Sequence, residues 1–104
     1  MVRKAFKMKL HSGMADEYRR RHEMLWPEMR DVIREHGGRN YSIFLDGQTD
    51  SLFAYLEVDD EGKWAAIADT EVCRRWWEYM APLMVVNIDN SPVSQDLQCV
   101  FHLD

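Results

Sequence analysis

One histidine of the sequence stands where proton-transfer chemistry could occur. His22 follows Tyr18 by four residues and precedes Pro27 by five, in a stretch whose apolar residues recur with a helical period. That spacing makes Tyr18 and His22 neighbours on one helix face. Imidazole titrates near neutral pH, so His22 is a candidate acid–base residue. A histidine packed in the core with a proline kink beside it fits the same pattern.

The adjacent tryptophans Trp76 and Trp77 are a second candidate group. Helical period places Trp76 on the inward arc together with Cys73 and Met80, and it places Trp77 about 100° away at the margin of that arc. Two bulky indoles side by side are more than a small core requires. They could fill the core or a dimer interface, or they could line a ligand cavity with apolar faces and N–H donors.

Metal and nucleophile chemistry find little support in the sequence. His22 and His36 share a helix face but lie about 21 Å apart along it, too far to bind one metal ion. Cys73 and Cys99 lack metal-site spacing, and neither a nucleophile elbow nor a glycine-rich phosphate loop occurs. We therefore expect no metal site.

The composition is that of an ordinary globular protein. Of 104 residues, 46% are hydrophobic and 30% are charged, enough for one domain over 1–104 but not for two cores. A net charge of −5 disfavours a nucleic-acid partner. The N-terminus lacks the apolar run of a signal peptide, no segment could span a membrane, and the cysteines fit a reducing compartment. We expect a cytoplasmic protein that binds neither nucleic acid nor membrane.

Hydrophobic periodicity divides the chain into six segments. Pro27 should kink the first helix or make it restart near Trp26, and Thr70 can cap a new turn within the second. The segments are strand 2–10, helix 14–36, strand 40–46, strand 52–58, helix 60–80 and strand 97–103.

This order is typical of the ferredoxin-like βαββαβ fold, an α+β arrangement in which two helices cover one face of an antiparallel sheet. Strand 52–58 is apolar on both faces, so something should cover each side. In a single chain the second face would expose an apolar patch, which a second copy could cover. We expect a homodimer whose two sheets pack into a dimeric α+β barrel.

Several stretches of the chain form a recognisable set. They are Met1–Phe6, Glu17-Tyr18 with Arg20–His22, Trp26–Glu28, Asn40-Tyr41, Cys73 with Arg75–Trp77 and Tyr79-Met80, and Asp89–Ser94. Together they resemble the L-rhamnose mutarotase family over essentially the full chain. Met24 and Ile88 depart from the family pattern, which often has proline there.

The resemblance implies an isomerase that interconverts the α and β anomers of L-rhamnose without a cofactor, as a dimer. It implies that His22 is the proton donor and that Tyr18, Tyr41, Trp76 and Trp77 contact the sugar. We expect His22 to protonate the ring oxygen while a second, unidentified group removes the proton of the anomeric hydroxyl.

Two other functions fit the same fold. The dimeric barrel also resembles small monooxygenases, including haem-degrading ones, and fold alone does not separate these activities. The second function is that of a sugar-binding dimer without enzymatic activity, in which His22 only packs in the core.

Overall fold

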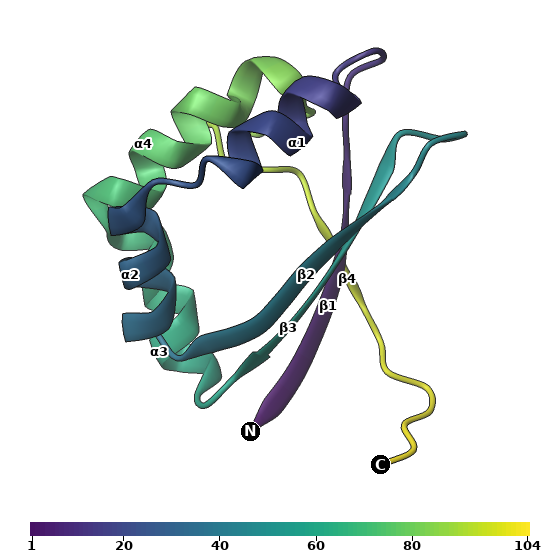
Figure 1. The fold of residues 1–104 in the computed structure, drawn as a ribbon. Helices are drawn as coiled ribbons and strands as arrows, with labels where there is room; N and C mark the ends of the chain where they lie inside the picture. Colours follow the sequence, from purple (N-terminus) through teal and green to yellow (C-terminus); the bar gives the residue numbers. More distant parts are fainter.

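The computed structural model describes residues 1–104 as a four-stranded antiparallel sheet with helices over one of its faces (Figure 1). The spatial order β2-β3-β1-β4, with every neighbouring pair antiparallel, is that of the ferredoxin-like fold, so the predicted fold is confirmed. The strands are β1 (Val2–Lys9), β2 (Gly38–Asp46), β3 (Ser51–Val58) and β4 (Gln95–Leu97).

Four α-helices form the second layer, on the left of Figure 1. None of them is long and apolar enough to cross a bilayer. They are α1 (Ala15–Glu23), α2 (Pro27–Glu35), α3 (Glu61–Ala65) and α4 (Glu71–Met80), with two short 3₁₀ helices at Ala66–Asp69 and Ala81–Leu83.

The helix predicted over 14–36 restarts at Pro27. Trp26 has extended backbone angles, φ −59° and ψ 134°, and its carbonyl accepts the N–H groups of Met29 and Arg30 at 3.0 Å. Proline is favourable in the first turn because its missing N–H would have no intrahelical partner there. As a result α1 and α2 run in different directions (Figure 1).

Thr70 interrupts the second helical region as predicted. Its backbone is extended, with φ −79° and ψ 143°, and its hydroxyl accepts the N–H of Cys73 at 3.3 Å. This side-chain cap starts α4 anew after the 3₁₀ turn, and so it fixes the rotation of α4 that turns Cys73 and Trp76 inward.

The prediction of a last strand over 97–103 is wrong in position. β4 is three residues long, Gln95–Leu97, and it pairs with Ala5–Lys7 of β1. The following residues leave the sheet, and Figure 1 shows the yellow C-terminal segment extending away from it. Their alternating apolar residues are not buried in the chain, since Val100 and Phe101 are 89% and 78% exposed.

The two faces of the sheet differ in cover. On β3, Leu52, Ala54, Leu56 and Val58 are buried under the helices. Phe53 points to the opposite face, is 37% exposed and lies beside Phe44 of β2, which is 66% exposed. Within one chain nothing covers this outer face, and the dimeric barrel stays a prediction.

Candidate active site

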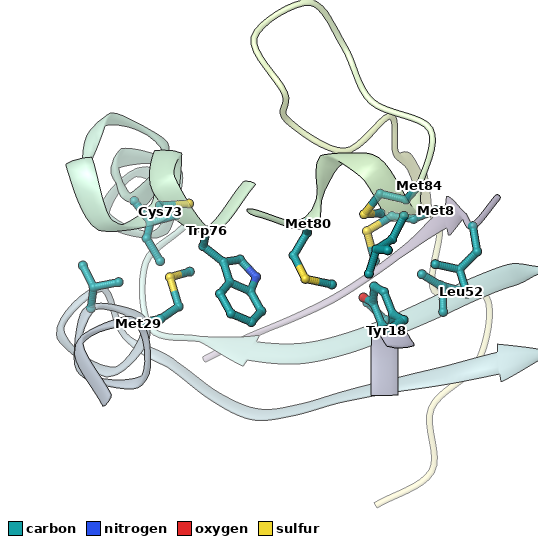
Figure 2. Close-up of a cluster of buried hydrophobic side chains, with 13 residues drawn as sticks. Met8, Tyr18, Met29, Leu52, Cys73, Trp76, Met80 and Met84 are labelled. Carbon is teal, nitrogen blue, oxygen red and sulfur yellow. The ribbon is translucent and has the colours of Figure 1, made fainter. Parts of the chain in front are cut away.

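A cavity of about 890 Å³ lies between the helices and the covered face of the sheet. Its lining is mostly apolar, and its volume is within the usual range for small-molecule sites. Figure 2 shows part of its wall, with Trp76, Met80 and Tyr18 directed into the space over the sheet. The five residues predicted from the sequence all line it: Tyr18, His22, Tyr41, Trp76 and Trp77.

His22 is held in the cavity wall by its own helix and by two aromatic rings. Its Nδ1 lies 3.1 Å from the Tyr18 carbonyl oxygen, and because a carbonyl only accepts, Nδ1 carries the hydrogen. The Tyr18 ring stacks on the imidazole at 4.3 Å between ring centres. Trp76 meets it edge-on at 5.4 Å. These contacts leave Nε2 as the ring nitrogen available to a ligand.

The protonation state of His22 follows from this packing. Burial lowers its pKa below the ordinary value of 6.5, and the hydrogen bond to the Tyr18 carbonyl opposes the shift only in part. At neutral pH the imidazole is therefore uncharged, with a lone pair on Nε2. In its resting state His22 accepts a proton before it can donate one.

Tyr18 presents a neutral hydroxyl to the cavity. Burial raises the pKa of its phenol well above the usual range, with a smaller contribution from Tyr41, so the hydroxyl keeps its proton. The Tyr18 hydroxyl makes no hydrogen bond within the chain. Since no side-chain nitrogen or oxygen that lacks a hydrogen-bond partner is fully buried, this hydroxyl must be accessible to solvent. The hydroxyl therefore opens into the cavity, where it can exchange hydrogen bonds with a ligand.

A bulge in β2 places Tyr41 on the cavity side of the sheet. The register shifts by one residue between Arg39 and Ser42, and Asn40 takes a left-handed backbone with φ 49°, which asparagine tolerates. Tyr41 meets Phe6 edge-on at 6.5 Å. Burial raises its pKa to about 12, with a smaller contribution from Cys73, although 36% of its surface is accessible. It is a second neutral hydroxyl.

Trp76 belongs to the core and to the cavity at once. It is 7% exposed, packs edge-on against Trp26 at 5.1 Å, and still lines the cavity. Trp77 is half-buried at the margin of the helix face, as its period predicts, and lines the same cavity. Trp76 therefore fills part of the core and also forms part of the cavity wall, whereas contact of either indole with a ligand stays a prediction.

Some cavity residues were absent from the predicted set. Arg19 and Glu23 are the charged side chains of the lining, and both flank His22 on α1. Asn87 comes from the loop before β4, where its Nδ2 donates to the Ser91 hydroxyl at 3.0 Å. Helical spacing from His22 could have suggested Arg19, which lies three residues earlier on the same helix, but not the directly adjacent Glu23. No local pattern says that the Asn87 loop returns to the cavity.

The remaining chemistry of the site is limited. No three residues among the histidines, cysteines, aspartates and glutamates lie close enough together to hold a metal ion. Cys73 is buried, and burial raises the pKa of its thiol to about 11, so a thiolate nucleophile is disfavoured there. Besides the charged side chains of Arg19 and Glu23, the cavity offers one imidazole, neutral hydroxyls and aromatic faces.

The comparison with known proteins is consistent with the side chains that line this cavity. A family model described as L-rhamnose mutarotase matches residues 3–103. The chain belongs to the L-rhamnose mutarotase family. It is 58% identical over 104 residues to the L-rhamnose mutarotase of Lachnoclostridium phytofermentans and 56% identical to that of Bacillus subtilis, with the whole of each chain covered.

Solved structures agree with the family assignment. The crystal structure of an L-rhamnose mutarotase from Formosa agariphila superimposes with a TM-score of 0.93 at 42% identity, covering all of both chains. A putative antibiotic biosynthesis monooxygenase from Nitrosomonas europaea superimposes with a TM-score of 0.64 at 14% identity, over 97% of this chain and 100% of that one. The second likeness shows a shared fold and nothing about activity.

Proposed function

We propose that this chain is an isomerase that interconverts the α and β anomers of L-rhamnose, with His22 as the residue that moves the proton. Family membership over the full chain supports the reaction and the sugar. The observation that carries the role of His22 is its geometry: Nδ1 is engaged by the Tyr18 carbonyl and Nε2 is free in an aromatic cavity.

Anomer exchange requires two proton movements at one carbon. The hydroxyl on C1 loses its proton, the bond between C1 and the ring oxygen breaks, and the ring oxygen gains a proton. The open-chain aldehyde then rotates about the C1–C2 bond and closes on its other face. A positioned acid–base group contributes about 10²- to 10⁴-fold to such a step, enough for a reaction that already proceeds in water.

One imidazole can supply both movements. Because His22 rests uncharged, its Nε2 takes the proton of the C1 hydroxyl and then delivers that proton to the ring oxygen as the C–O bond breaks. Both oxygens are bonded to C1, so one nitrogen can reach both. In this account His22 is the donor to the ring oxygen, and the proton it donates comes from the substrate.

The remaining residues fit a neutral sugar with an apolar end. The hydroxyls of Tyr18 and Tyr41 supply hydrogen bonds to sugar oxygens, and the indoles of Trp76 and Trp77 provide flat surface for the ring and the methyl group of a 6-deoxy sugar. The two charged lining residues, one of each sign, leave the lining without net charge. That balance favours an uncharged ligand.

Assembly and compartment remain part of the proposal. The exposed outer face around Phe44 and Phe53 supports a homodimer in which that face is covered by a second copy. The composition supports a cytoplasmic enzyme with no nucleic-acid partner.

The direct test of the activity is saturation-transfer NMR on L-rhamnose. Saturating the C1 proton of one anomer should reduce the signal of the other in proportion to the exchange rate, and catalytic amounts of the protein should increase that transfer. D-glucose at the same concentration serves as a comparison sugar. If the folded protein adds nothing to the exchange of L-rhamnose, the proposal fails.

A further inference from the structure

Helix α1 carries His22 but is weakly anchored by its apolar side chains. Tyr18 is its one buried residue. The backbones of α2 and α4 approach each other closely, whereas α1 has no comparably close helix neighbour. The extended residue Trp26 separates α1 from α2, so the second helix does not hold the first by continuity. Leu25 and Trp26, which follow α1, pack against the core, and a direct link to another helix would further fix the end of α1 at which His22 lies.

Arg21 makes that contact. Its Nη1 donates a hydrogen bond to the carbonyl of Tyr79, and its guanidinium lies over the Tyr79 ring at 4.2 Å. Its Nε donates to Glu17 at 2.6 Å, one turn earlier on α1. The side chain is only 19% exposed. Arg21 therefore joins the C-terminal end of α1 to the C-terminal end of α4.

The α4 end of this link is packed against other aromatic rings. Tyr79 lies in the last turn of α4, where carbonyl groups lack intrahelical partners and accept from other donors. Its ring packs against Trp26 at 5.4 Å and against Trp76 at 5.7 Å. Trp76 is the ring that meets His22 edge-on. Arg21 thus binds the same aromatic cluster that forms one wall around the imidazole.

Glu17 orients the arginine. It accepts hydrogen bonds from Arg20 and Arg21, and these two bonds lower the pKa of its carboxyl to about 2. The carboxylate is therefore charged at any pH at which the protein would be assayed. The carboxylate of Glu17 holds the planar guanidinium of Arg21 so that its Nε donates to Glu17 while its Nη1 donates to the Tyr79 carbonyl. The compact ammonium of a lysine cannot make both contacts at once.

We propose that Arg21, oriented by Glu17, is a positioning residue for the reaction: it ties α1 to Tyr79 of α4 and so keeps the His22 ring between Tyr18 and Trp76. This inference rests on the proposed role of His22. Arg21 is not among the residues that line the cavity, so it acts through His22 and not on the sugar.

The test compares Arg21 with Arg20 in the full-length protein. Arg20 also pairs with Glu17 and lies near the Tyr79 hydroxyl, but it is 56% exposed and donates no hydrogen bond to the Tyr79 carbonyl. The variants are R21K, R21A and the matched controls R20K and R20A. Each is assayed for anomer exchange of L-rhamnose, for melting temperature, and for the His22 pKa by NMR titration of its ring proton.

R21K should lower kcat by about 10- to 100-fold with a smaller change in KM, because a misplacement near 1 Å costs about that much. The His22 pKa should rise toward its ordinary value as the ring loses its fixed place against Trp76. Guanidinium chloride at millimolar concentration should restore part of the activity of R21A. R20K and R20A should stay within about threefold of wild type.

The inference is overturned if folded R21K and R21A keep wild-type kcat with an unchanged His22 pKa, or if the Arg20 variants lose as much activity. These results differ from failure of the proposed function. If the proposed activity fails, the wild-type protein itself adds nothing to the exchange, and if only the role of His22 fails, H22A keeps full activity. Failure of the Arg21 inference alone leaves the wild type active and H22A inactive. If R21A does not fold, R21K, which keeps the charge, decides the question.

Discussion

The Nδ1–H of His22 donates a hydrogen bond to the backbone carbonyl of Tyr18, 3.1 Å away and one helical turn earlier. The same residue that fixes the tautomer through its backbone also stacks its ring on the imidazole. Because the partner atom belongs to the main chain, no substitution of the Tyr18 side chain removes that hydrogen bond. The helix that positions His22 therefore also determines which nitrogen is free in the cavity.

This separation of backbone and side chain makes Y18F a specific test. The variant keeps the stacked ring and the carbonyl, so the His22 tautomer should not change. It loses the one hydroxyl, and loss of a hydrogen bond to the sugar should reduce kcat/KM by about 10-fold. NMR of the His22 ring confirms the first point and exchange kinetics measure the second. Wild-type kcat/KM in Y18F would mean that the hydroxyl does not bind the substrate.

The activity should fall in acid, with a midpoint below pH 6.5. Burial lowers the His22 pKa, and only the uncharged imidazole can take the proton of the C1 hydroxyl. Along α1 the neighbouring charges are Arg19, Arg21 and Glu23, and from α4 the packed ring is the uncharged indole of Trp76. Plots of log kcat/KM against pH should be flat at neutral pH. A rate that rises as pH falls would identify the imidazolium as the reacting form.

The exposed outer face of the sheet predicts the oligomeric state. Phe53 is 37% exposed beside the more exposed Phe44, and a charge placed there should prevent a second copy from packing. Light scattering should give twice the mass of one chain for wild type and the mass of one chain for F53D. The matched control is I88D, because Ile88 is a fully exposed loop residue. A monomeric wild type, or a dimeric F53D, contradicts the prediction.

Local signals in the sequence were sufficient for most of the fold. Pro27 and Thr70 each act within their own helical region, so both interruptions could be predicted. Pro27 lacks a backbone N–H, and the Thr70 hydroxyl accepts the N–H of Cys73. The alternation in the last segment was misleading because alternation indicates a strand only where one face is covered. Around Val100 and Phe101 neither face of the segment is covered.

The site was predicted less evenly than the fold. Tyr18 and His22 could be paired from helical spacing, but the role of Tyr41 rested on the family resemblance. Its place in the cavity depends on a bulge at Asn40 that no period reveals. Asn87 was missed because it reaches the cavity through the fold of its loop. Nothing in the helical period shows that Arg21 reaches α4, where its Nη1 donates to the Tyr79 carbonyl and its side chain is only 19% exposed.

The central claim is that His22 moves the proton, and the sharpest test compares it with His36. His36 also lies at the end of a helix and has its Nδ1 near a carbonyl four residues earlier, that of Val32 at 2.7 Å, but it does not line the cavity. Saturation-transfer rates of L-rhamnose should fall by about 10²- to 10⁴-fold in H22A and stay at the wild-type value in H36A. A folded H22A that exchanges the anomers as fast as wild type would contradict the account.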